Sequence, residues 1–208
     1  MVAREAPAIR IYTDVERAAS LKETLDARPD GDIWLFAYGS LIWNPTITPA
    51  DCKVARVQGW HRSFCLSIVA GRGSAQFPGL VLGLDVGGDC LGVAYKMHPD
   101  LMEKELELLW RREMLTSGYV PRWVDIFNTE GSPMGKALTF TIDPTAISYA
   151  GMLSRDETIA RLATAPDTWD LRRNTCSLLA TGCSTSESRT AGSRIWQWPW
   201  RGLSRSES

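Results

Sequence analysis

The sequence of 208 residues is poor in the residue types that mark metal and redox sites. It contains only 2 histidines, and no two of its 5 cysteines have the C-x-x-C spacing of a zinc or disulfide-exchange motif. Lysine and arginine number 23 against 24 aspartates and glutamates, which leaves a net charge of −1. The chain therefore lacks the excess of positive charge that marks nucleic-acid binding. We expect neither a metal ion nor a nucleic-acid partner.

Long hydrophobic runs are also missing. The longest run, residues 33–43, is interrupted by a Gly-Ser pair and is much shorter than the roughly 20 residues that cross a bilayer. The first part of the chain carries charged residues and no apolar core, so it does not have the pattern of a secretory signal. We expect a cytoplasmic protein without a membrane partner, and no pattern in the sequence indicates an oligomeric state.

The chain does contain a series of strand patterns with few helices between them. The continuous apolar run at 33–38 is typical of a strand buried on both faces. Alternating leucines followed by Gly87 and Gly88 predict a β-hairpin that turns at these two glycines. Several antiparallel strands with few interleaved helices favour an α+β fold over a doubly wound sheet. The strand patterns occur at residues 33–38, at 54–69 as a pair of strands, at 80–86 and 89–96 as the two strands of the hairpin, at 123–127 and at 137–141.

Three helices are predicted between and around these strands. The first begins near Thr13, and the other two begin near Asp100 and Ser154, each of which has a glutamate three residues later as in a capping box. We therefore divide the chain into three parts. These are a lead-in with a short helix at 1–31, a single domain at 32–165 and an atypical, poorly ordered tail at 166–208.

The helix predicted over residues 100–115 carries one carboxylate in an unusual place. At about 100° per residue, Met102, Leu106 and Leu109 form an apolar stripe, and the next position on that stripe is Glu113. A carboxylate that loses solvation has a raised pKa, which suits it to exchange protons near neutral pH. The alternative is a structural role at the helix end, where Glu113 pairs with Arg62, Arg112 or Arg122.

Three ordered segments together resemble the ChaC family of γ-glutamylcyclotransferases, over about residues 32–165. The first is Phe-Ala-Tyr-Gly-Ser-Leu-Ile-Trp-Asn-Pro at 36–45. The second is Arg-Gly at 72–73, followed by Pro-Gly-Leu-Val-Leu-Gly-Leu at 78–84 and Gly-Val-Ala-Tyr at 92–95. The third is Trp-Arg-Arg-Glu-Met at 110–114, followed by Tyr119 and Trp123.

This resemblance implies a fold, a reaction and a set of site residues. The implied fold is a small mixed, mostly antiparallel β-barrel with flanking helices. The implied reaction converts glutathione to 5-oxoproline and cysteinylglycine without a cofactor, with Glu113 as the catalytic glutamate. Many members of the family carry glycine where this chain has Ala37, a change that we expect to have little effect. The implied substrate-binding loop is Ala37, Tyr38, Gly39, Ser40, Leu41 and Ile42.

The chemistry of these residues is consistent with that assignment. A strand that ends in Gly-Ser can present successive backbone N–H groups to a carboxylate or an oxyanion. Attack of the γ-glutamyl amine on its own δ-carbonyl needs a positioned base but no nucleophilic side chain, so Ser40 is expected to bind and not to attack. An ordinary tight turn after a buried strand is the alternative interpretation of Tyr38-Gly39-Ser40.

Two further functions remain open at this point. One is a cyclotransferase that acts on other γ-glutamyl compounds, which would use the same proton chemistry with a different leaving group. The other is a non-catalytic binding or regulatory protein of the same fold, although a binding protein gains nothing from a buried carboxylate at Glu113.

The end of the chain departs from the pattern of the domain. Where a closing amphipathic helix is expected, the sequence is rich in Ser, Arg, Thr and Trp and shows neither a helical nor a strand period. We expect the residues from about Ala165 onward not to be a native part of the domain, with a change of reading frame as the cause. The alternative is a lineage-specific tail in which Trp196, Trp198 and Trp200 dock on the barrel or bind a partner.

We therefore predict that limited proteolysis removes this tail first. Its composition has few of the aliphatic residues that a core helix needs, so its backbone should be accessible to proteases. Mass spectrometry of the first fragments identifies where the protease cuts. Quenching of tryptophan fluorescence measures how exposed the tryptophans of the tail are to solvent. A tail that resists cleavage, together with blue-shifted tryptophan emission protected from quenchers, would contradict the reading-frame interpretation.

Overall fold

The computed structural model describes residues 9–74 and 76–164, apart from the side chains of residues 70–72. The tail predicted at 166–208 lies outside the described residues, so its expected character stays a prediction. The elements within the described part are α2 (Asp14–Asp26), β1 (Trp34–Ala37), the 3₁₀ turn η1 (Ser40–Ile42), β2 (Pro49–Gly73), β3 (Pro78–Met97), α3 (Met102–Glu113), β4 (Tyr119–Phe127), β5 (Pro133–Ile142) and α4 (Arg155–Thr164).

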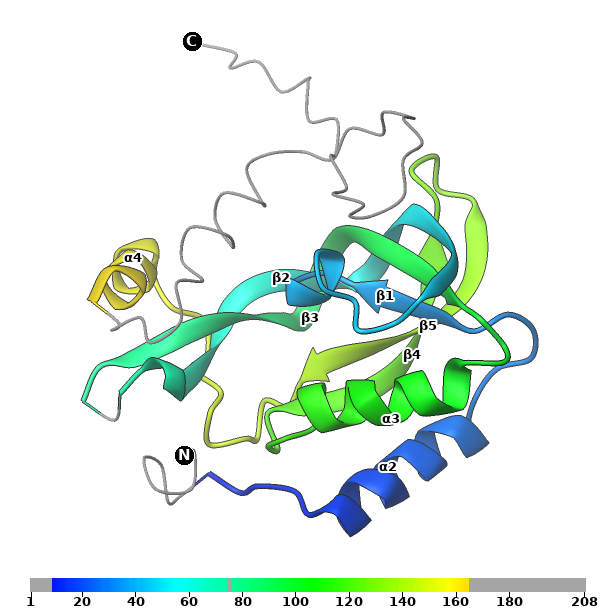
Figure 1. Cartoon of the computed structure of the whole chain (residues 1–208). Coiled ribbons are helices and arrows are strands. Elements are labelled where there is room, and N and C mark those ends of the chain that lie inside the picture. The colour runs from blue at the N-terminus through cyan, green and yellow to red at the C-terminus, as the bar shows by residue number, and fades with distance from the viewer. Residues whose placement is uncertain (1–8, 75, 165–208) are drawn as a thin grey trace, which may run out of the picture. The chain divides into compact units, whose positions relative to one another are not determined.

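The five strands close into a barrel in the order β1-β3-β2-β4-β5. Every neighbouring pair is antiparallel except β1 and β5, which are parallel and close the barrel through Trp34 opposite Ala137 and Leu35 opposite Leu138. Figure 1 shows β2 and β3 continuing past the barrel as a long two-stranded extension. The α+β fold with a mixed, mostly antiparallel barrel and flanking helices is therefore confirmed.

Helices cover the outside of the barrel in two places. The ring of Trp110 in α3 meets the ring of Phe140 in β5 edge-on, with centroids 5.3 Å apart. Helix α2 lies beside α3 in Figure 1, and Trp110 Nε1 donates to Ser20 Oγ of α2 at 3.3 Å. Helix α4 lies against the β2–β3 extension, where Arg161 Nη1 donates to Ser67 Oγ at 3.4 Å. Helix α3 is thus held between the barrel and α2.

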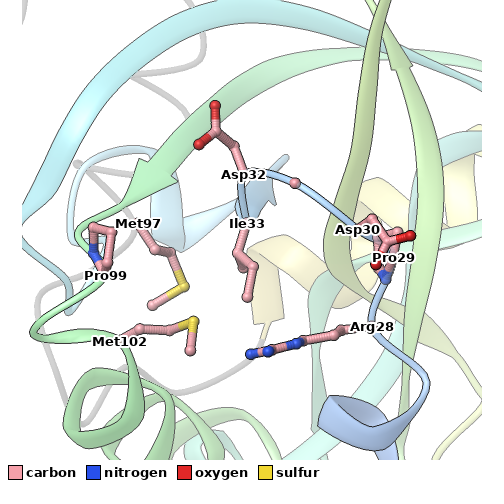
Figure 2. Close-up of a pocket in the computed structure, with 9 residues that line it drawn as sticks. Arg28, Pro29, Asp30, Asp32, Ile33, Met97, Pro99 and Met102 are labelled. Atoms are coloured by element: carbon pink, nitrogen blue, oxygen red, sulfur yellow. The ribbon is translucent and has the colours of Figure 1, made fainter.

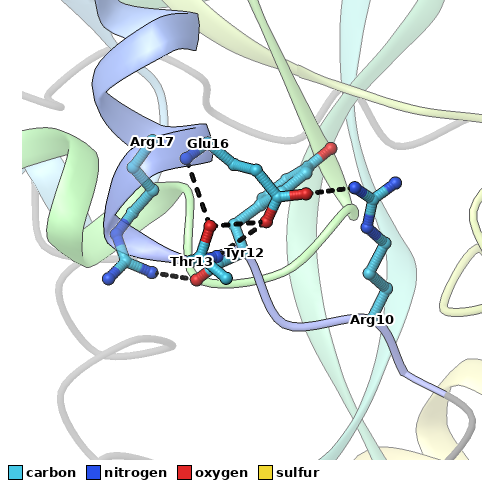
Figure 3. Close-up of polar contacts among 5 residues, drawn as sticks. All are labelled: Arg10, Tyr12, Thr13, Glu16 and Arg17. Carbon is cyan, nitrogen blue, oxygen red and sulfur yellow. Dashed lines mark hydrogen bonds and ion pairs between the residues drawn. The ribbon is translucent and has the colours of Figure 1, made fainter.

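The predicted start of α2 is confirmed by its contacts. The hydroxyl of Thr13 accepts from the Glu16 N–H at 3.2 Å, and the Glu16 carboxylate accepts from the Thr13 N–H at 2.8 Å. Figure 3 shows this reciprocal pair with Arg10 on the outer side of Glu16 and Arg17 turned back toward Tyr12. A capping box satisfies N–H groups that have no partner within the helix. The same reciprocal pair of bonds joins Ser154 and Glu157 at the start of α4.

The hairpin predicted at Gly87 and Gly88 is wrong. These glycines lie in the middle of the single long strand β3, and the chain instead reverses between Gly73 and Pro78. The stretch 54–69 is likewise part of one strand, β2. Gly59 in β2 faces the two glycines, since Gln58 pairs with Asp89 and Trp60 pairs with Val86. All three glycines have positive φ, 77°, 105° and 65°, so the same residues that could make a turn make a bulge here.

The capping box predicted at Asp100 is also not formed. Helix α3 begins at Met102 with Leu101 as its N-cap and has no side-chain cap, and the Asp100 N–H donates to Nδ1 of His98 at 3.4 Å. The apolar stripe of this helix is confirmed, with Leu106 and Leu109 fully buried. Among the described residues, no helix is both long and apolar enough to cross a membrane.

Candidate active site

The predicted loop lies directly after β1 and contacts the last turn of α3. Ala37, Tyr38, Gly39 and Leu41 are buried, whereas Ser40 is exposed. The turn is closed by the Ile42 N–H, which donates to the Gly39 carbonyl at 2.9 Å. A Cβ atom added at Gly39 would meet no atom within 4 Å, so open space lies beside the backbone at this position. A ligand could therefore approach the backbone closely there.

A single arginine of α3 holds this loop. Arg112 Nη2 donates to Ser40 Oγ at 2.8 Å, and its Nη1 donates to the Asn44 carbonyl at 2.5 Å and to Thr46 Oγ1 at 2.7 Å. Thr46 has a φ of 62°, which is rare for a β-branched residue. Such a conformation persists only where surrounding contacts impose it. Arg112 supplies one of these contacts, and it ties the loop to the end of α3.

Two further side chains hold the same segment. Tyr95 of β3 donates its hydroxyl to the Ile42 carbonyl at 2.7 Å. The buried carboxylate of Glu105 accepts the Thr48 N–H at 2.7 Å through Oε1, while its buried Oε2 has no hydrogen-bond partner among the described residues. Sequence reasoning missed Glu105, although its place beside the stripe residues Leu106 and Leu109 was a usable signal. The loop is therefore held from both β3 and α3.

Glu113 lies at the last position of α3, next to Arg112. Its side chain is only 13% exposed, and Oε1 lies 3.0 Å from Arg112 Nε without making a hydrogen bond. Burial raises the pKa of the Glu113 carboxyl above its ordinary value, and the positive charge of Arg112 acts in the opposite direction. The carboxyl is thus both desolvated and next to a cation, which combines the two interpretations that the sequence left open.

Two phenols lie near this carboxyl, those of the buried Tyr38 and the half-buried Tyr119. The hydroxyl of Tyr38 donates to the Phe140 carbonyl at 2.8 Å, and that of Tyr119 donates to the Leu82 carbonyl at 3.2 Å. Burial raises the pKa of both tyrosines, and the charge of Glu113 raises them further. Both phenols therefore stay neutral at pH 7 and can act only as hydrogen-bond donors or acceptors near Glu113.

The cysteine near these tyrosines is not suited to nucleophilic attack. Cys65 is fully buried, and burial together with the charge of Asp85 raises the pKa of its thiol to about 11. The thiol is therefore protonated at neutral pH, whereas attack requires the thiolate. In residues 9–74 and 76–164, no group of three or more His, Cys, Asp or Glu side chains is placed to hold a metal ion.

A separate pocket of about 240 Å³ lies at the opposite end of β1. Figure 2 shows Met97 of β3, Met102 of α3 and Ile33, the residue before β1, converging on it, with the side chain of Arg28 beside them. Ile33 precedes β1, whereas the predicted loop follows that strand. Neither the loop residues nor Glu113 line this pocket, so it is distinct from the candidate site.

Comparison with known proteins gives consistent matches. A family model described as ChaC-like protein matches residues 33–168. An Escherichia coli protein named glutathione-specific gamma-glutamylcyclotransferase is 42% identical over 156 residues, which cover 74% of this chain and 67% of that protein. A human protein named glutathione-specific gamma-glutamylcyclotransferase 1 is 35% identical over 131 residues, 60% of this chain and 59% of that protein. The crystal structure of a glutathione-specific γ-glutamyl cyclotransferase from yeast has the same fold, with a TM-score of 0.64 at 18% identity, covering 73% of this chain and 86% of that one.

We predict that the Arg112→Met variant raises the pKa of Glu113. The variant removes the cation that lies 3.0 Å from the carboxyl oxygen and leaves the burial that already raises the pKa. NMR titration of the side-chain carboxyl carbon of Glu113 measures the change. The matched control is Arg111→Met, the exposed neighbour on the same helix, which should leave this pKa in place. An unchanged or lowered pKa in Arg112→Met would contradict the assigned contact.

Proposed function

The chain belongs to the ChaC-like family, and on this basis we propose that it is a glutathione-specific γ-glutamylcyclotransferase. The names of its bacterial and human relatives support this substrate. One observation in this chain supports the chemistry most directly. The buried carboxyl of Glu113, with its raised pKa, is joined through Arg112 to the loop that carries Tyr38, Gly39 and Ser40.

The proposed reaction is a cyclisation within the substrate. Glu113 takes a proton from the α-amine of the γ-glutamyl group, and the amine nitrogen attacks the δ-carbonyl carbon of the same group. The carbon–nitrogen bond to the cysteine residue then breaks, and Glu113 returns the proton to the leaving nitrogen. The products are 5-oxoproline and cysteinylglycine, with no water or cofactor consumed. Attack within one molecule needs little more than correct positioning and a suitable base.

The loop has a separate task in this proposal, which is to bind the charged end of the γ-glutamyl group. In η1 the Ile42 N–H is bonded to the Gly39 carbonyl, whereas the N–H groups of Ser40 and Leu41 precede this first bond of the turn. These donors can bind the α-carboxylate, and the open space beside Gly39 gives room for it. The same donors or their neighbours would stabilise the oxyanion that forms when the δ-carbonyl is attacked. Ala37 and the side chains of Tyr38 and Leu41 are buried, so they support the loop from the interior of the protein.

The proposal also places the enzyme in the cytoplasm, where its substrate would be present in the reduced form. Cys52, Cys65 and Cys90, the cysteines among the described residues, are free thiols. Free thiols are the normal state of cysteines in a reducing compartment.

We predict that the purified protein releases 5-oxoproline from glutathione and that γ-glutamyl-alanine is a poor substrate. Chromatography with mass spectrometry measures 5-oxoproline and cysteinylglycine, which should form in equal amounts. Equal rates with γ-glutamyl-alanine would favour a cyclotransferase for other γ-glutamyl compounds. Absence of 5-oxoproline with both substrates would favour a non-catalytic relative.

We further predict that Glu113→Gln lowers kcat by about 10²–10⁴-fold, because the amide cannot carry the proton. The matched control is Glu107→Gln, an exposed residue of the same helix, which should keep the wild-type rate. Since burial disfavours the charged carboxylate, the variant should fold at pH 7 at least as well as the wild type. Thermal unfolding of the two variants checks this. Substantial activity in folded Glu113→Gln would show that another group moves the proton.

A further inference from the structure

Arg62 of β2 is a cation on the barrel side of the sheet, and no carboxylate among the described residues forms an ion pair with it. It pairs across the strands with Leu84, which is fully buried in the barrel core, and paired residues of an antiparallel sheet point to the same face. Arg62 Nη2 donates to the Leu91 carbonyl at 2.7 Å, and its buried Nε has no hydrogen-bond partner in the described part of the chain. By contrast, Arg56 on the same strand forms an ion pair with Asp89.

A second arginine, Arg122 of β4, lies on the same side. Its guanidinium carbon is 5.7 Å from the centre of the Trp60 ring, and its Nε donates to Thr141 Oγ1 at 3.1 Å. Trp60 packs against the barrel core and precedes Arg62 by two residues on the same face of β2, which places their Cα atoms about 7 Å apart. None of the ion pairs among the described residues includes Arg62 or Arg122.

Both arginines are anchored next to the loop after β1. The Leu91 carbonyl, which accepts from Arg62, belongs to the residue before Gly92. Gly92 lies against the loop, because a Cβ atom added to it would be 2.3 Å from the Ala37 carbonyl oxygen. Thr141, which holds Arg122, follows Phe140, whose carbonyl accepts the Tyr38 hydroxyl. The two cations therefore lie at the same end of the barrel as the loop and Glu113.

Two cations on one side of a barrel, without a counter-charge, are suited to bind an anion. A partly buried guanidinium is stabilised when it is paired, and arginine binds carboxylates in a directed, two-pronged geometry. Arg62 is half-buried and its Nε has no hydrogen-bond partner among the described residues, while the more exposed Arg122 lies over Trp60. A glutathione molecule has a second carboxylate, at the glycine end, which the loop of the proposed function does not bind.

We propose that Arg62 and Arg122 bind the C-terminal carboxylate of the leaving peptide and thereby select γ-glutamyl peptides over γ-glutamyl compounds that lack this charge. This inference rests on the proposed function and adds a recognition site for the leaving group to it. The loop binds the γ-glutamyl end, Glu113 serves the reacting atoms, and the arginine pair binds the other end of the substrate.

The test compares glutathione with the analogue whose glycine carboxylate is replaced by an amide. For the wild type, KM should be about 10- to 150-fold higher for the amide, the effect of losing one charge-assisted hydrogen bond, with kcat changed much less. Arg62→Met and Arg122→Met should raise KM for glutathione and leave KM for the amide unchanged, so that the preference disappears. Arg62→Lys should restore part of it. The control is Arg155→Met, an exposed arginine on α4.

A wild type that does not distinguish the two compounds would overturn the proposal, as would variants that affect both compounds equally. Arg122 is exposed, so its variant should fold even if Arg62→Met does not. A second measurement separates this proposal from the proposed function. Calorimetry should show that the wild type binds cysteinylglycine more tightly than its amide, and that Arg122→Met loses the difference. This result requires no turnover, so an inactive protein that still shows it would contradict only the proposed function, and its absence would overturn the arginine pair.

Discussion

The candidate site depends on the guanidinium of Arg112. This one group accounts for three hydrogen bonds to the segment 40–46 and lies 3.0 Å from the carboxyl of Glu113. The loop and the carboxyl come from distant parts of the sequence, and Arg112 contacts both of them. Because Arg112 is rigidly planar and always charged, it can hold both at once in a way that a lysine could not. The position of the loop relative to Glu113 is therefore tied to the end of α3, and the packing of α3 against the barrel becomes part of the site.

The pairing of β1 with β5 and β3 also fixes where the loop begins. The parallel contact between β1 and β5 brings Tyr38, just after β1, beside Phe140 of β5, where its hydroxyl is bonded. The antiparallel contact between β1 and β3 is close because Gly92 has no side chain to strike the Ala37 carbonyl. Neighbouring strands thus approach β1 on both sides at the point where the loop begins. This explains why the turn after β1 can stay open on one face while its other residues are buried.

Several local patterns in the sequence predicted local structure correctly, although the capping box predicted at Asp100 did not form. The capping boxes of α2 and α4 and the apolar stripe of α3 involve residues three to four positions apart, and such pairs depend little on the rest of the fold. The glycines of the long strands could not be interpreted in this way. Gly87 and Gly88 have the positive φ that a turn requires, but they face Gly59 of another strand and form a bulge with it. Whether two such glycines turn or bend a chain depends on the partner strand, which no local pattern reveals. The contacts of Arg112 and Glu105 with the loop have the same long-range character, so they appeared only in the structure.

Periodicity predicted the burial of Glu113. Its position at the end of α3 has a further effect on the pKa of its carboxyl. Desolvation favours the neutral carboxyl, and the partial negative charge at a helix C-terminus acts in the same direction. Arg112 opposes both, so its loss would shift the carboxyl further toward its protonated form. With too much positive charge nearby, the carboxyl would instead lose its proton too easily to act as an acid. A group that must first accept a proton and then return it needs a pKa between these limits. The last turn of α3 provides opposing influences of this kind, and the same arginine that balances the carboxyl also holds the loop that would receive the substrate.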